Sequence, residues 1–153
     1  MAKLHYEADG RVTAAAFIRA LTDFSERRPE FWPDLSARLF RVHELGDTWA
    51  DVTEGSDFLG AVWARERYDW STPGIVRLTL RDSADFVPGT VIEYHVTDTP
   101  GGCHVAVDFQ RIARSPRGRL VGVLVQLVGA RQFATSLRTA LDRVATLEAE
   151  LDT

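Results

Sequence analysis

The stretch VIEYHVTDTPGGCHVAVDF, Val91–Phe109, decides the fold because it has the pattern of two strands joined by a tight turn at Pro100-Gly101-Gly102. If Asp98 pairs with Cys103, apolar residues of the two strands face one another. These are Ile92, Tyr94 and Val96 on the first strand and Phe109, Val107 and Val105 on the second. Polar residues then share the opposite face, so both strands agree on which side is the inner one.

A second stretch, AVWARERYDW at 61–70, alternates like a strand but carries charges on both faces. Turning Arg65 and Arg67 inward would bury two guanidinium groups that cannot lose their charge. Turning Glu66 and Tyr68 inward buries one carboxyl, which can be neutralised or hydrogen-bonded. We therefore expect Glu66 to lie on the inner face.

The order of elements predicts an α+β fold. We expect a strand at 3–12, then a helix capped by Thr13 and ended by Pro29, with one further short turn before Pro33. Six strands are expected at 38–45, 48–54, 60–70, 75–83, 90–98 and 103–112, and the orientation of 38–45 stays open. A long helix begins at Ser115 and Pro116, and it must cover one face of the antiparallel sheet.

Composition bounds the class of protein. With 153 residues and 45% hydrophobic content, the chain is expected to form one soluble domain, 1–153. Cys103 is the only cysteine, which suits a reducing cytoplasm. A net charge of −4 disfavours nucleic-acid binding. The longest apolar run, LVGVLVQLVGA from Leu120, is about half the ~20 residues that span a bilayer, so no stable membrane insertion is expected.

Helical periodicity predicts that the last helix leaves a hollow. Its inner stripe of bulky residues comprises Phe133, Leu137, Leu141, Val144 and Leu151. Toward the N-terminus this stripe continues into Ala130, Gly129, Gln126, Val123 and Gly122, which leave space. Leu120, Leu124, Leu127 and Val128 point away from the sheet. Either the helix bends near Gly129, or a loop or a partner covers them, and a homodimer is one such arrangement.

The chain resembles the START-like, birch-pollen-allergen-like helix-grip superfamily (SRPBCC) over nearly its whole length. The resemblance rests on the helical pair TAAAFIRALTDFSERRPEFWP, the strand meander, the last helix, and the segments ERYDW and SPRGRL. It implies a curved antiparallel sheet wrapped around the C-terminal helix, one or two short helices after the first strand, and a ligand cavity between sheet and helix. It does not imply a reaction, because the superfamily includes carriers, receptors, cyclases and dehydratases.

Glu66 is the candidate catalytic residue, because a carboxyl in an apolar cavity has a raised pKa that suits general acid or base chemistry. Tyr68 and Tyr94 could donate hydrogen bonds to a ligand oxygen. The alternatives are that Glu66 only contacts a ligand or forms a structural pair. The expected ligand-binding residues are Glu66, Tyr68, Leu78, Tyr94, Val107, Phe109, Phe31, Trp32, Gly122, Val123, Gln126 and Gly129. Phe31 and Trp32 are interpreted either as gate residues or as packing against the last helix.

The preferred hypothesis is a binder of a hydrophobic small molecule, such as a lipid, polyketide or isoprenoid-like compound, without a cofactor. The alternatives are a polyketide cyclase, aromatase or dehydratase acting through Glu66, and a protein-interaction module. Two surface clusters stay open. His95, His104, Glu93 and Asp108 form an outer cluster that is interpreted as a solvated face rather than a metal site. Arg111, Arg114, Arg117 and Arg119 form a run that is interpreted as solvated surface or as a contact for an anionic lipid or ligand.

Overall fold

The computed structural model describes residues 1–32, 34–57 and 59–152, so the predicted boundary at Pro33 lies outside the described residues. The sheet strands are β1 (Ala2–Gly10), β2 (Arg41–Leu45), β3 (Trp49–Ser56), β4 (Val62–Asp69), β5 (Ile75–Asp82), β6 (Val91–Thr99) and β7 (Gly102–Arg111). The helices are α1 (Ala14–Leu21), α2 (Arg28–Phe31), the short 3-10 helix η1 (Ala37–Leu39) and α3 (Pro116–Leu151). This is the expected α+β order, with two short helices after the first strand.

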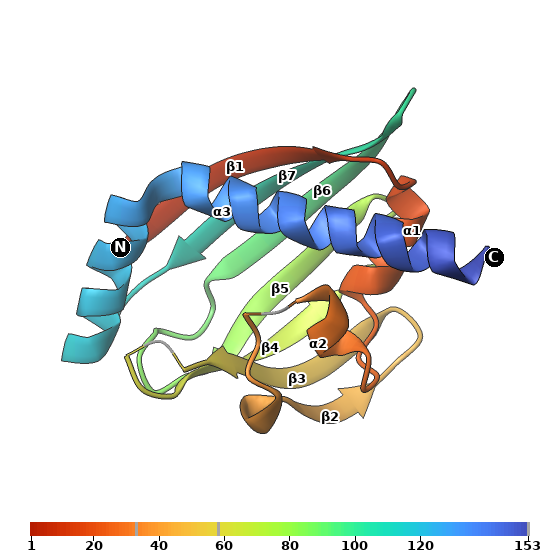
Figure 1. Ribbon diagram of the computed structural model, residues 1–153. Helices are drawn as coiled ribbons and strands as arrows, with labels where there is room; N and C mark the ends of the chain where they lie inside the picture. Colours follow the sequence, from red (N-terminus) through yellow and green to blue (C-terminus); the bar gives the residue numbers. More distant parts are fainter. Residues whose placement is uncertain (33, 58, 153) are drawn as a thin grey trace.

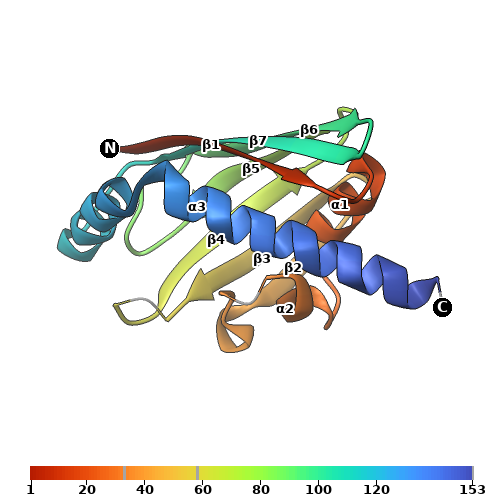
Figure 2. The same cartoon turned by 45° about the horizontal axis from the view of Figure 1, so that its top comes forward.

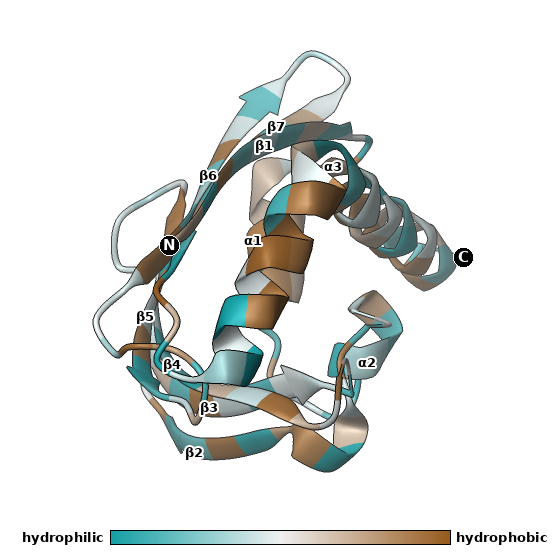
Figure 3. Ribbon diagram, turned by 90° about the vertical axis from the view of Figure 1, so that its left-hand side faces the viewer, coloured by the Kyte–Doolittle hydropathy of each residue, from teal (hydrophilic) through white to brown (hydrophobic). Residues whose placement is uncertain are grey.

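The strands form one antiparallel sheet in the order β1-β7-β6-β5-β4-β3-β2, which curves around α1 and α3 (Figures 1 and 3). The β6–β7 hairpin has the predicted register: Asp98 lies opposite Cys103, and Tyr94 lies opposite Val107. The beginning of the predicted strand 38–45 is wrong, because η1 precedes β2 there. All five residues of β2 are exposed. Because the strand has no buried face, its sequence lacks the alternation of apolar and polar residues that would mark where it begins. The predicted end of the first helix at Pro29 is also wrong, because α1 ends at Leu21 and Pro29 lies in the first turn of α2.

The orientation expected for β4 is confirmed. Glu66 is buried and lies opposite Val52 of β3 and Leu80 of β5. Arg65 lies on the outer face, where its guanidinium donates two hydrogen bonds of 2.8 and 2.9 Å to the carboxylate of Asp51. The arginine therefore keeps its charge near water, as the comparison of burial costs requires.

Helix α3 begins as the sequence predicts, with the Ser115 hydroxyl accepting a hydrogen bond from the Gly118 amide and Pro116 in the first turn. The helix is broken at Gly129, where φ is 76° and ψ is 176°. Figures 1 and 2 show the first part of α3 lying at an angle to the rest. Of the alternatives that the sequence left open, the structure shows the bend near Gly129.

The core lies between the inner face of the sheet, α1 and the second part of α3. Phe17 of α1, Val105 and Val107 of β7 and Leu141 of α3 are completely buried. Figure 3 shows the apolar α1 lying inside the curve of the sheet. The residues predicted to face the sheet from α3 do so as far as Val144. Leu151 was wrongly included, since it is 69% exposed at the end of the helix.

Candidate functional site

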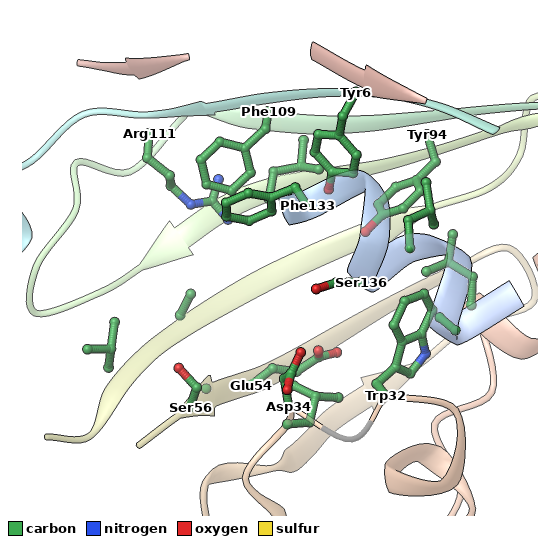
Figure 4. A pocket seen from close by; sticks show the side chains of 18 of the residues that line it. Tyr6, Trp32, Asp34, Glu54, Ser56, Tyr94, Phe109, Arg111, Phe133 and Ser136 are labelled. Carbon is green, nitrogen blue, oxygen red and sulfur yellow. The ribbon is translucent and has the colours of Figure 1, made fainter. Parts of the chain in front are cut away.

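A cavity of about 610 Å³ lies between the inner face of the sheet and the second part of α3. A second compartment of about 480 Å³ adjoins it under the first part of α3. The two compartments share lining residues, including Phe109, Arg111, Phe133 and Ser136. Figure 4 shows these side chains around the hollow, with Ser136 reaching into it from the helix. The predicted hollow is therefore present, and it runs along much of α3.

Aromatic rings form the wall of the cavity on the side of β1 and β7. Phe133 of α3 packs against Phe109 with a centroid distance of 5.9 Å and against Tyr6 with a centroid distance of 5.6 Å. Ile92 and Leu137 extend this apolar lining. Such a wall favours an apolar or aromatic molecule, because contact with it removes apolar surface from water.

Two tyrosines place hydroxyl groups inside this apolar region. In Figure 4, Tyr6 of β1 and Tyr94 of β6 both point from the sheet into the cavity. Burial raises the pKa of Tyr6 to about 12, against the opposing effect of a hydrogen bond with Tyr94. Burial also raises the pKa of Tyr94 well above its ordinary value. Both groups are therefore neutral at physiological pH and can donate or accept hydrogen bonds.

A buried ion pair lies on the opposite wall. The guanidinium of Arg28 donates to Oε1 of Glu54 through Nε at 3.1 Å and through Nη2 at 2.9 Å. Tyr68 donates its hydroxyl proton to the same oxygen at 2.9 Å and accepts from Arg28 at 3.0 Å. Arg28 also donates to the carbonyl of Leu21 and stacks over the ring of Phe24. Burial acts against the charge of Arg28, but Tyr68 and Glu54 together raise the pKa of its guanidinium.

Glu66 forms a second buried ion pair, in which Arg111 donates a hydrogen bond to Oε1 of the carboxyl. Burial raises the pKa of Glu66, and the positive charge of Arg111 counteracts part of that rise. Arg111 lines both compartments, whereas the carboxyl of Glu66 does not line either of them. Glu66 therefore holds the arginine in place, and the group that faces the cavity is the guanidinium.

The structure brings together part of the predicted ligand-binding set. Tyr68, Tyr94, Phe109 and Trp32 line the main compartment, and Gly122 lines the second. Three further residues, Leu78, Val107 and Phe31, are buried in the core beside the cavity without lining it.

The remaining predicted residues lie elsewhere because the helix breaks at Gly129. Val123 is 55% exposed, and the side-chain amide of Gln126 donates to the backbone carbonyl of Lys3. The prediction continued one straight helical stripe past Gly129. The break there changes which side of the first part of α3 faces the sheet, so Val121 and Val125 line the second compartment. Leu124 and Val128, which were expected to point away from the sheet, also line it.

Sequence reasoning missed Tyr6, Arg28 and Glu54 as lining residues, and it gave ligand contact only as the alternative for Arg111. Glu54 shares the inner face of β3 with the buried residues Ala50 and Val52, so strand alternation could have identified it. Arg111 likewise follows Phe109 by two residues on β7, and the interpretation of this arginine as solvated surface is wrong. No local signal marks Arg28, whose partner is distant in the chain.

The outer histidines engage different carboxylates. His95 lies 2.7 Å from Glu93, whereas His104 contacts Asp9 at 2.7 Å and Glu7 at 2.9 Å. Within the described ranges, no group of three or more histidine, cysteine or acidic side chains is arranged to hold a metal ion. On this face, the histidines therefore contact carboxylates of β1 and β6.

No family model and no curated protein matches the sequence. Solved structures with the same fold include a protein from Thermus thermophilus, which is 16% identical with a TM-score of 0.76 over 95% of this chain and 98% of that chain. A START superfamily protein from Mycobacterium smegmatis is 13% identical, with a TM-score of 0.70 over 96% and 99% of the two chains. The Zhui aromatase/cyclase from a Streptomyces species is 12% identical, with a TM-score of 0.71 over 94% and 93%. The chain has the helix-grip fold of these structures, which is the fold that the resemblance in its sequence implied.

Proposed function

We propose that the protein binds one hydrophobic small molecule in the cavity between the sheet and α3. The observation that carries the proposal is the cavity itself. Its main compartment, at about 610 Å³, falls within the range of roughly 300–1,000 Å³ that small-molecule sites occupy. The known aromatase/cyclase and START structures with this fold support the same class of function.

The lining suggests an aromatic or extended apolar ligand that carries a few oxygen atoms. The rings of Phe109 and Phe133 would pack against the apolar part of the molecule. The hydroxyls of Tyr6 and Tyr94 would bond a carbonyl or hydroxyl, and Arg111 would bond an oxygen at the junction of the two compartments. A polyketide-like compound meets these requirements better than a saturated lipid chain, which offers no partners for the polar groups.

Acid–base catalysis through Glu66, the alternative predicted from the sequence, has less support. A general base must come within hydrogen-bond reach of the proton that it removes. The carboxyl of Glu66 is bonded to Arg111 and lies outside the lining. Two other carboxyls line the cavity. Oε1 of Glu54 already accepts hydrogen bonds from Arg28 and Tyr68, and Asp34 is exposed to solvent. Binding is therefore the function that the site supports better than catalysis through Glu66.

Fluorescence titration with N-phenyl-1-naphthylamine, an uncharged aromatic probe, tests this proposal. We expect saturable binding of one probe molecule. Ser136→Trp should weaken it at least ten-fold, because Ser136 lines both compartments. Arg138→Trp is the matched control, since Arg138 is exposed on the same helix and lines neither compartment. Equal binding by both variants and the wild type would count against the cavity as the site.

A further inference from the structure

The described surface carries its large exposed hydrophobic side chains mostly at one end of the molecule. We call this group the apolar end: Met1, Leu59, Val87, Ile112, Leu120, Val123, Leu127 and Val128. The amide of Val87 is hydrogen-bonded to the carbonyl of Ile112, and the loop at Gly60 lies beside Arg117 of α3. We propose that the apolar end docks on the surface of an anionic lipid bilayer.

The first part of α3, Pro116–Val128, contributes the main face. Leu120, Val123 and Leu127 follow one another at helical spacing and are 50%, 55% and 76% exposed. Soluble monomers rarely leave such a row of large apolar side chains in water. A helix with one exposed apolar face and basic flanks is the usual form of a segment that lies in a membrane interface.

The charge of this region fits an anionic surface. The segment 109–141 contains six arginines and no acidic residue, in a chain whose net charge is −4. Arg111 and Arg117 are ion-paired with Glu66 and Asp85, so the charge that can face a bilayer comes from the other arginines. Arg119 is exposed beside Leu120, and Arg114 and Arg131 are exposed nearer the two ends of this part of the helix. Each basic residue near an anionic bilayer raises partitioning by about five-fold. The same charges disfavour a symmetric contact between two copies, which would bring like charges together without acidic partners on this segment.

The position is interfacial and does not span the membrane. By length and composition alone, α3 could cross a bilayer, and only 11% of its most apolar window is buried. However, the helix breaks at Gly129, so its first part is well short of the ~20 residues that a span requires. The docked face would project into the headgroup region and the boundary of the acyl chains.

The docking face and the cavity share one helical segment. Val121, Leu124 and Val125 line the second compartment from the side of α3 that faces the sheet. Leu120, Val123 and Leu127 lie on the exposed side of the same turns. A bilayer bound to one side would therefore lie next to the compartment that the other side closes. The docking itself does not depend on a ligand in the cavity.

Vesicle flotation tests the proposal, using phosphatidylcholine vesicles with and without phosphatidylglycerol. We expect the wild type to float with the anionic vesicles only, and high salt to release it. Leu127→Glu and Arg119→Glu should each reduce the bound fraction at least five-fold. Leu45→Glu and Arg11→Glu are matched controls, because both residues are exposed outside the apolar end, and these variants should bind like the wild type.

A fluorescent label gives a second readout that does not depend on loss of binding. Cys103 is fully buried, so a nitrobenzoxadiazole label will react with an added cysteine in Leu127→Cys. Its emission should shift to shorter wavelength on anionic vesicles, and a label in Leu45→Cys should not shift. The proposal is overturned if the wild type ignores anionic vesicles or if Leu127→Glu floats like the wild type. It is also overturned if sedimentation reveals a dimer that Leu127→Glu converts to monomers, because a second copy would then cover this face.

Discussion

Replacing Glu54 by glutamine tests whether the buried ion pair with Arg28 holds the wall of the cavity together. The change keeps the shape of the side chain and one oxygen that can accept hydrogen bonds, but it removes the negative charge. The guanidinium of Arg28 is almost completely buried, and among the described residues Glu54 is the one acidic side chain that accepts hydrogen bonds from it. Glu54→Gln therefore leaves a positive charge in the core without a counter-charge.

Removing one partner of a buried ion pair costs about 3–5 kcal/mol, and we expect the lower value, about 3 kcal/mol, because glutamine still accepts a hydrogen bond. For a domain of this size, a loss of about 3 kcal/mol lowers the melting temperature by roughly 6–12 °C. Thermal unfolding followed by circular dichroism measures the shift, and urea unfolding measures the free energy directly.

Two variants make the reasoning refutable. Asp51→Asn removes the carboxylate that pairs with Arg65 on the outer face, where solvent can replace it, so it should cost less than about 1 kcal/mol. Arg28→Met combined with Glu54→Gln should be more stable than Glu54→Gln alone, because no unpaired charge remains buried. If Glu54→Gln costs no more than Asp51→Asn, or if the double variant is the least stable, the charge pair does not hold the wall.

Two further predictions concern the exposed face and the helix break. Hydrogen bonds with Glu7 and, to a smaller extent, Asp9 raise the pKa of His104 in the folded protein. The protonated histidine therefore stabilises the fold fully at pH values below its unfolded pKa of about 6.5. This stabilisation is lost as the pH rises through the higher pKa of the folded state. Urea midpoints should therefore favour the wild type over His104→Gln more at pH 5.5 than at pH 8.5, and equal differences at the two pH values would contradict this. Gly129→Ala should cost about 1–3 kcal/mol in urea unfolding, because φ of 76° with ψ of 176° is open only to glycine. Gly122→Ala is the control, because Gly122 lies in regular helix and the nearest atom would be 3.8 Å from the added carbon. It should leave the free energy of unfolding unchanged or raise it. If Gly129→Ala is as stable as Gly122→Ala, the prediction is wrong.

Local patterns predicted the parts of the fold that depend on neighbouring residues. The register of β6 and β7 follows from the turn at Gly101-Gly102 and from strict alternation, and Ser115 with Pro116 marks the beginning of α3. The inward orientation of Glu66 follows from comparing the costs of burying one carboxyl or two guanidinium groups.

The site depends on contacts that no local pattern encodes. Arg28 of α2 meets Glu54 of β3, and Glu66 of β4 meets Arg111 of β7. These partners are far apart in the chain and come together only in the folded molecule. The phase of α3 changes at Gly129, so a helical stripe extended through that residue selects the wrong side of the first part of the helix. A glycine can predict that a helix bends, but the direction of the bend comes from packing against the rest of the molecule.

The most direct test of the central claim is to identify what the protein carries after purification under native conditions. Organic extraction followed by mass spectrometry should recover one apolar, oxygen-bearing compound from the wild type and from Arg138→Trp. It should recover little or none from Ser136→Trp, in which the cavity is filled. Recovery of the same compound from all three proteins, or of none from the wild type together with failure to bind an aromatic probe, would contradict a ligand-binding cavity between the sheet and α3.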